Sequence, residues 1–136
     1  MDLIFKKLQL KVLEKEGRTY SFAELQDFID FDVKRLYFIQ GHEMQPTGQH
    51  CHKIEKELFV MVKGTATAII DQGQGKEEIP LREPGDAIYV GNYVWHGYKD
   101  FSPDSVLLAI SSTNYSPDRT DYIEDYDEYR KVIGGN

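Results

Sequence analysis

The stretch TGQHCHKIEKELFVMVKG, residues 47–64, combines two closely spaced histidines with a strand-like apolar run. In an extended chain, side chains two residues apart point to the same face, so we expect His50 and His52 to project together and Cys51 to point away. Glu57 follows, and the apolar run that starts there stops at a glycine. Two imidazoles that face one cavity can share a metal ion or a proton. The stretch therefore predicts a functional site at the mouth of a strand.

Short strand-like segments make up most of the remaining chain. They are rich in β-branched and aromatic residues, and the turns between them carry Gly, Pro, Asp or Asn. Many short strands at close spacing are typical of an antiparallel sandwich or barrel, so we predict an all-β fold. The predicted strands cover residues 34–41, 57–64, 65–71, 86–91, 93–98 and 106–112.

One helix is expected near the C-terminus, over DYIEDYDEYRKVIGG at residues 121–135. Its acidic residues come early, its basic residues come late, and the Gly134–Gly135 pair stops it. Residues 19–24 are ambiguous. Ser21 and Glu24 have the spacing of a helix capping box, while the residues around them also suit a strand, so both interpretations are open on these residues alone.

The 136 residues suit one domain over residues 1–136, with 40% hydrophobic and 29% charged residues. The net charge of −7 argues against nucleic acid or an anionic membrane surface as the main partner, although a few basic side chains can still bind a small anion. No apolar run reaches the ~18 residues of a membrane span, and we expect no signal peptide. Cys51 is the only cysteine and forms no internal disulfide, so a cytoplasmic location is expected.

A third histidine, His96, lies in another strand-like segment, GDAIYVGNYVWHGY at residues 85–98. Together with His50, His52 and Glu57 it makes a set of three imidazoles and one carboxylate. Such a set suits Fe, Mn, Ni, Cu or Zn, so a metal-dependent oxygenase or isomerase is one hypothesis. The other is that the histidines move protons without a metal, because the pKa of an imidazole lies close to neutral pH.

The spacing of these residues resembles the two motifs of the cupin superfamily, which are small jelly-roll β-barrels. The first motif reads H-x-H, four residues, Glu, six residues, Gly, and it is matched without a gap as far as Gly64. The second reads Gly, five residues, Pro-x-Gly, two residues, His. Gly85 and His96 fall in register, but Gly91 replaces the proline and Tyr93 the second glycine. The resemblance implies a cupin-type jelly-roll β-barrel with a short C-terminal helix.

Nearly the whole chain further resembles the dTDP-4-keto-6-deoxyglucose 3,4-ketoisomerases, a cupin branch that works without metal. The resemblance is carried by the segments IDFDVKRLYFI, HCHK, YVWHGYKDFSPDSVLLAISSTNY and DYIEDYDEY. It favours a strand over residues 19–24. Two positions differ from the family pattern. Thr47 stands where the family usually has Arg, and Glu57 stands where it usually has Gln. Because glutamate is a common metal ligand, the second difference keeps the metal hypothesis open.

The resemblance implies an isomerase that moves the keto group of a dTDP-4-keto-6-deoxyhexose from C4 to C3 through an enediol(ate), in deoxyamino-sugar biosynthesis and without a cofactor. A base must remove the acidified C3 proton, and a proton must return at C4. We predict that His52 is the carbon base, that His50 is its partner on the oxygen side, and that Tyr37 donates to O4. Substrate-binding roles are expected for Arg35, Lys53, His96 and Tyr98.

The expected partner is a dTDP-linked 4-keto-6-deoxy sugar, bound by a homodimer. The N-terminal stretch MDLIFKKLQLKVL is long and apolar, and a strand there can pair with the sheet of a second copy and cover its edge. A third hypothesis is a non-catalytic module that binds sugar nucleotides or other small ligands. Turnover separates catalysis from binding, and metal analysis separates the two enzyme classes.

Overall fold

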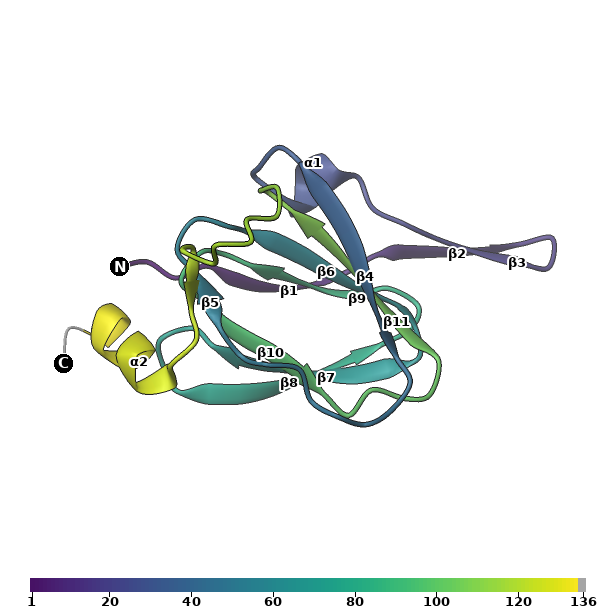
Figure 1. Cartoon of the computed structure of the whole chain (residues 1–136). Coiled ribbons are helices and arrows are strands. Elements are labelled where there is room, and N and C mark those ends of the chain that lie inside the picture. Colours follow the sequence, from purple (N-terminus) through teal and green to yellow (C-terminus); the bar gives the residue numbers. More distant parts are fainter. Residues whose placement is uncertain (135–136) are drawn as a thin grey trace.

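Figure 1 shows the computed structural model of the chain, which describes residues 1–134. One five-stranded sheet has the order β1-β9-β6-β11-β4, one three-stranded sheet has the order β10-β7-β8, and β12-β5 and β2-β3 form separate pairs. The elements are β1 (Phe5–Gln9), β2 (Lys11–Lys15), β3 (Arg18–Phe22), α1 (Leu25–Phe28), β4 (Arg35–Gly41), β5 (Cys51–His52), β6 (Glu57–Lys63), β7 (Thr65–Asp71), β8 (Lys76–Arg82), β9 (Asp86–Val90), β10 (Trp95–Lys99), β11 (Ser105–Ser111), β12 (Tyr122–Ile123) and α2 (Tyr126–Gly134).

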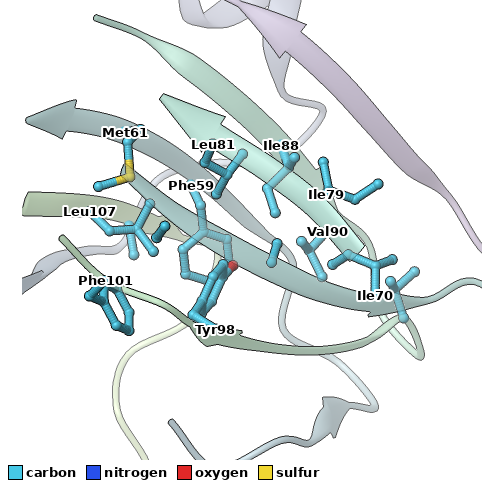
Figure 2. Close-up of a cluster of buried hydrophobic side chains, with 14 residues drawn as sticks. Phe59, Met61, Ile70, Ile79, Leu81, Ile88, Val90, Tyr98, Phe101 and Leu107 are labelled. Carbon is cyan, nitrogen blue, oxygen red and sulfur yellow. The ribbon is translucent and has the colours of Figure 1, made fainter. Parts of the chain in front are cut away.

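The two larger sheets face each other and enclose the core (Figure 1). Alternation along the strands decides which side chains enter it. Leu107 and Ala109 of β11 and Ala66, Ala68 and Ile70 of β7 are all buried, with more exposed residues between them. Figure 2 shows how these faces meet around the large apolar side chains Phe59, Met61, Ile79, Leu81, Ile88, Val90, Tyr98 and Phe101.

The prediction of an all-β fold with a short C-terminal helix is confirmed. The two larger sheets are separate in their hydrogen bonding and do not join into one closed barrel. The strand β8, KEEIPLR, was not predicted, because charged residues and a proline dominate it. It lies at the edge of the three-stranded sheet, where Pro80 and the charged side chains are tolerated because one side of the strand needs no hydrogen-bonded neighbour.

The N-terminal stretch forms a strand, β1, which pairs in antiparallel register with β9 of the same chain. Its pairing with a second copy stays a prediction. The hairpin β2–β3 then extends away from the sheets (Figure 1). Glu16 and Gly17 form its two-residue turn, with φ angles of 54° and 75°. Positive φ at both positions gives the turn the twist that flanking strands need.

The ambiguous segment is a strand, because β3 covers Arg18–Phe22. The capping-box interpretation is wrong, since the four-residue helix α1 begins only at Leu25 and its N-cap, Glu24, makes no side-chain capping bond. The predicted C-terminal helix is confirmed as α2, which Asp125 caps by accepting a hydrogen bond from the backbone N–H of Glu128 at 2.8 Å. The predicted stop at Gly135 lies outside the described residues. None of the described helices has the length and apolar character to span a membrane.

The two departures in the second cupin-like motif have a local explanation. The backbone N–H of Gly91 donates to the carbonyl of Ile4 at 2.9 Å, a bond that proline cannot make. A Cβ at Gly91 would also lie 2.7 Å from that carbonyl oxygen. Tyr93 adopts a φ of 63° despite its side chain. The turn therefore has a left-handed residue at Tyr93, and the backbone of Gly91 hydrogen-bonds the N-terminal segment to this turn.

Candidate functional site

Two backbone pairings bring the three histidines together. β5 pairs with β12 and places His52 opposite Tyr122. His50 exchanges backbone hydrogen bonds with His96 of β10, at 3.0 and 2.8 Å. The ring centroid of His50 lies 4.7 Å from the centroid of His52 and 4.7 Å from that of His96. The centroids of His52 and His96 are 5.6 Å apart. Cys51 points the other way, into an apolar cluster with Trp95, Ile123 and Tyr129. The predicted alternation of the H-x-H stretch is confirmed.

Asp121 fixes the orientation of His52. Its Oδ2 lies 3.1 Å from His52 Nδ1, and its two oxygens also accept the backbone N–H groups of Ile54 and Glu55. An imidazole whose Nδ1 faces a carboxylate carries its hydrogen there, so Nε2 of neutral His52 is an acceptor. That atom lies 3.1 Å from Nε2 of His50, which must therefore be the donor. The result is a hydrogen-bonded chain from His50 through His52 to Asp121.

Both histidines of this chain are held neutral. Burial, together with repulsion from His96 and His52, lowers the pKa of His50 to about 2. Burial and repulsion from His96 lower the pKa of His52 to about 4, although Glu57 and Asp121 act in the opposite direction. Neutral imidazoles have a free lone pair at pH 7 and can accept a proton.

Glu57, the first residue of β6, is a buried carboxylate, and only one of its two oxygens accepts a hydrogen bond within the described residues. Its Oε2 accepts a hydrogen bond from the Tyr37 hydroxyl at 2.5 Å. Its Oε1 lies 3.5 Å from Nε2 of both His52 and His96 and has no hydrogen-bond partner among the described residues. Burial alone raises the pKa of Glu57, but the nearby imidazoles of His96 and His52 and the hydrogen bond from Tyr37 lower it to about 2. Burial and Glu57 raise the pKa of Tyr37, so the phenol stays protonated.

A cavity of about 230 Å³ opens beside this cluster. His50, His96, Tyr37 and Tyr98 lie on its wall, while His52 lies behind His50. Tyr98 packs against Phe59 in the core, with ring centroids 5.0 Å apart (Figure 2), and both residues also line the cavity. Its buried hydroxyl has no hydrogen-bond partner within residues 1–134. An unpaired buried hydroxyl is costly, so this oxygen is an unused hydrogen-bonding group beside the cavity.

The structure brings Arg35 to the cluster but not Lys53. Arg35 donates to Glu55 at 2.9 Å, and its guanidinium carbon lies 5.1 Å from the centre of the Tyr37 ring. Arg35 is thus already paired with an acidic partner, and its guanidinium packs against the Tyr37 ring. It lies on the wall of a second cavity of about 180 Å³. Lys53 is tied to the cluster only through its backbone, whose N–H donates to the carbonyl of Asp121 at 2.8 Å, while its side chain is exposed and does not line the cavity.

Three residues of the site were not predicted. Asp121 holds His52 from a position 69 residues away, and the Tyr122 ring packs at 4.8 and 4.4 Å from the rings of His50 and His52. Arg119 reaches the wall of the larger cavity. The segment DYIEDYDEY, which carries part of the family resemblance, begins at Asp121 and was the signal for the first two.

Comparison with known proteins identifies the family of this chain. A family model described as FdtA, WxcM-like, C-terminal, matches residues 2–134. The chain belongs to this family. It is similar to a curated relative, the TDP-4-oxo-6-deoxy-alpha-D-glucose-3,4-oxoisomerase of Aneurinibacillus thermoaerophilus, with 37% identity over 126 residues that cover 90% of this chain and 87% of the relative.

Solved structures of similar proteins extend the likeness to the fold. The WlaRB TDP-quinovose 3,4-ketoisomerase from Campylobacter jejuni has a TM-score of 0.83 at 29% identity, covering 93% of this chain and 97% of that one. The sugar 3,4-ketoisomerase QdtA from Thermoanaerobacterium thermosaccharolyticum, solved in complex with TDP, has a TM-score of 0.85 at 26% identity, covering 96% of this chain and 95% of QdtA. The FdtA-family chain therefore shares the fold of sugar-nucleotide ketoisomerases over nearly its full length.

Proposed function

We propose that this FdtA-family member is a TDP-sugar 3,4-ketoisomerase, which moves the keto group of a TDP-4-keto-6-deoxyhexose from C4 to C3. The 37% identical relative carries the name of this activity, and related structures are ketoisomerases, one of them with bound TDP. The observation that carries the mechanism is the hydrogen-bonded chain from His50 through His52 to Asp121, which ends at a cavity wall.

In the proposed mechanism, the neutral His50 removes the proton from C3. The electrons of the C3–H bond form the C3–C4 double bond of an enediolate, and the negative charge moves to O4. His50 then carries two protons, and its Nε2–H faces the acceptor nitrogen of His52, which Asp121 supports. This order reverses the roles expected from the sequence, because His50 lies on the cavity wall and His52 lies behind it. The proton returns at C4 as the ketone forms at C3.

The charge that develops on the sugar oxygens needs hydrogen-bond donors. The hydroxyl of Tyr98 is free to donate, because it has no partner in the described part of the chain. Tyr37 lies on the same wall, but its single O–H is donated to Glu57, so it can donate to O4 only after that hydrogen bond is exchanged. His96 lies on the same wall, with its Nε2 3.5 Å from Oε1 of Glu57, and is the proposed relay for the proton that moves between O3 and O4. These substrate contacts are inferred from the positions of the donors.

We also propose that residues 1–136 form one cupin-type jelly-roll domain that works in the cytoplasm. Two sheets packed face to face and the H-x-H motif support the fold proposal. The lone buried Cys51 is compatible with a reducing compartment. The nucleotide of the substrate is proposed to be thymidine diphosphate, the nucleotide in the relatives' names.

The assembly is proposed to be a homodimer that uses the outer face of the five-stranded sheet. A groove of about 790 Å³ lies there, between the hairpin β2–β3 and apolar side chains such as Leu58, Val60 and Leu108. Leu36 and Phe38 on the edge strand β4 are 61% and 58% exposed. A projecting hairpin and an uncovered apolar face are features that a second copy covers. Light scattering at micromolar concentration checks this, and a monomer mass would contradict it.

A metal-dependent enzyme is the second candidate, favoured by one observation. His50, His52 and His96 each offer a nitrogen, and these atoms lie within 4.8 Å of one another. With Glu57 they match the donor preferences of several transition metals. Elemental analysis of the purified protein separates the two candidates. We expect sub-stoichiometric metal and activity that a chelator leaves unchanged, whereas one metal per chain with loss of activity on chelation would favour the metal enzyme.

The proposed activity is tested by incubating the protein with TDP-4-keto-6-deoxyglucose and identifying the product by NMR. We expect a 3-keto sugar nucleotide. An unchanged substrate in the presence of folded protein that still binds TDP would favour a non-catalytic binding module.

A further inference from the structure

One cationic side chain, that of Arg119, lies on the wall of the larger cavity, the one of about 230 Å³ beside the histidines. Among the described residues that form this wall it is the single arginine, and none is a lysine. A guanidinium stays protonated at every relevant pH. Two other basic residues near the histidines do not line this cavity, since Arg35 is paired with Glu55 at the second cavity and the side chain of Lys53 is exposed. The larger cavity thus has a permanent positive charge at one position.

Arg119 is held in place from several directions. Its guanidinium carbon lies 3.9 Å from the centre of the Tyr122 ring, a stacked arrangement. Glu124 accepts hydrogen bonds from its Nε and from one of its amino groups, at 2.8 and 2.7 Å. The backbone of Arg119 adopts a φ of 57° and lies in a turn in which Asp118 accepts two hydrogen bonds from Thr120. The side chain is 46% exposed and forms part of the cavity wall.

The guanidinium has more donors than its partners use. Arginine has five N–H donors in a planar fork; Glu124 accepts from Nε and one amino group, and the Tyr115 side chain also lies beside the guanidinium. The remaining amino group suits a phosphate oxygen, because guanidinium and phosphate match in charge and geometry. A chain with a net charge of −7 repels an anion at long range, so a dianionic ligand needs such a local cation.

We propose that Arg119 binds the diphosphate of the sugar nucleotide and so positions the sugar ring against His50. This inference rests on the proposed function, because the diphosphate belongs to the proposed substrate. Arg119 is a substrate-binding residue in this account. Its contact is made equally in the ground state and the transition state, so its loss should raise KM and leave kcat nearly unchanged.

The alternative role for Arg119 is purely structural. Its stacking partner Tyr122 packs against His50 and His52, so removal of Arg119 could instead disturb the histidines. The two roles predict different kinetics. Disturbed histidines lower kcat without a specific loss of phosphate binding, whereas a lost phosphate contact weakens binding of TDP and leaves the uncharged thymidine unaffected.

The experiment compares four proteins by calorimetric titration with TDP and with thymidine: wild type, Arg119→Gln, Arg119→Lys and Arg82→Gln. Arg82 is an exposed residue of β8, away from the cavity walls, and its substitution makes the same change in net charge. We expect Arg119→Gln to weaken TDP binding by about 10- to 100-fold, the loss typical of a charge-assisted hydrogen bond. Arg119→Lys should weaken it less, because the charge is kept, and Arg82→Gln should change it by less than about twofold.

Thermal melting by circular dichroism verifies that each variant is folded. Equal TDP affinity of wild type and Arg119→Gln would overturn the inference but not the proposed function. A loss of kcat with unchanged TDP affinity would also overturn it, and would assign Arg119 to the support of Tyr122. If the wild type itself does not bind TDP, the proposed substrate and this inference both fall.

Discussion

Two fully buried carboxylates, Asp71 at the end of β7 and Glu57 at the start of β6, are satisfied to very different degrees. Asp71 accepts four hydrogen bonds, from the backbone N–H groups of Gly73 and Gly75, the Tyr126 hydroxyl and the Arg130 guanidinium. Glu57 accepts one, from Tyr37, and its second oxygen has no partner among the described residues. Burial raises the pKa of each, and their neighbours lower it overall.

The difference separates structure from function. The bonds of Asp71 come from β7, the following turn and α2, so they attach the C-terminal helix to the three-stranded sheet. Glu57, by contrast, faces two imidazole nitrogens beside a cavity and leaves hydrogen-bonding capacity unused. A fully satisfied buried carboxylate stabilises a fold, whereas a half-satisfied one among histidines indicates a place where protons or ligands are exchanged.

The largest expected effect on turnover comes from removing the proposed base, His50, in the cluster that contains Glu57. His50→Asn keeps a similar volume and polarity, so folding should change little, while loss of a general base typically lowers kcat by about 10² to 10⁴. His52→Asn should also lower kcat, because His50 then loses its acceptor. Turnover measured beside C3 proton exchange in D₂O checks both. If exchange and product formation survive in both variants, the histidine mechanism is wrong.

The matched substitution at the fully hydrogen-bonded carboxylate is Asp71→Asn. An amide cannot serve all four donors, so we expect the free energy of unfolding to fall by about 2–3 kcal/mol, the typical cost of leaving buried donors unpaired. Turnover at 25 °C should stay near the wild-type rate, since Asp71 lies outside the cavity. Urea unfolding and steady-state kinetics measure the two quantities. A loss of turnover comparable to that of His50→Asn would erase the distinction between the two carboxylates.

A smaller effect is expected for Glu57→Gln. Glutamine keeps an oxygen that can accept the Tyr37 hydroxyl, so kcat should fall by less than about tenfold, below the loss expected for a general acid or base. The measurement is turnover together with metal content. A loss of several hundredfold, accompanied by a loss of bound metal, would instead identify Glu57 as a ligand.

The smallest expected effect is a pH dependence of stability. His50 and His52 have pKa values lowered to about 2 and about 4, against 6.5 for an ordinary histidine. The unfolded state therefore binds more protons between pH 6.5 and 4, so stability is highest above this window and falls as the pH falls through it. We expect a loss on the order of 1 kcal/mol for each of the two histidines between pH 7 and 5.5. Urea unfolding of wild type and His50→Asn tests this, since the variant should show a weaker dependence.

The sequence predicted those parts of the site that depend on local periodicity. His50 and His52 share a face because strand alternation requires it, and His96 followed from a second strand-like segment. Arg35 and Tyr37 were placed together by the same rule. Asp121 and Arg119 were not predicted, since their contacts depend on how a turn near the C-terminus returns to the sheets. Similarly, strand patterns predicted six of the strands, but the hairpin β2–β3 has only exposed side chains and so lacks an alternating pattern.

The order of the two histidines was beyond sequence reasoning for a related reason. Both point to one face in an extended chain, and nothing in their spacing says which of them reaches the cavity. Tertiary packing decides it: β12 covers His52, while His50 faces the open space beside Tyr98 and His96.

The central claim is that neutral histidines move the ketone by proton transfer, and one measurement tests it most directly. The protein is incubated with TDP-4-keto-6-deoxyglucose in D₂O, and the product is examined by proton NMR. Transfer through an imidazole that exchanges with solvent predicts a 3-keto product with deuterium at C4, formed by wild type and not by His50→Asn. Formation of the same product by His50→Asn at the wild-type rate would contradict the account.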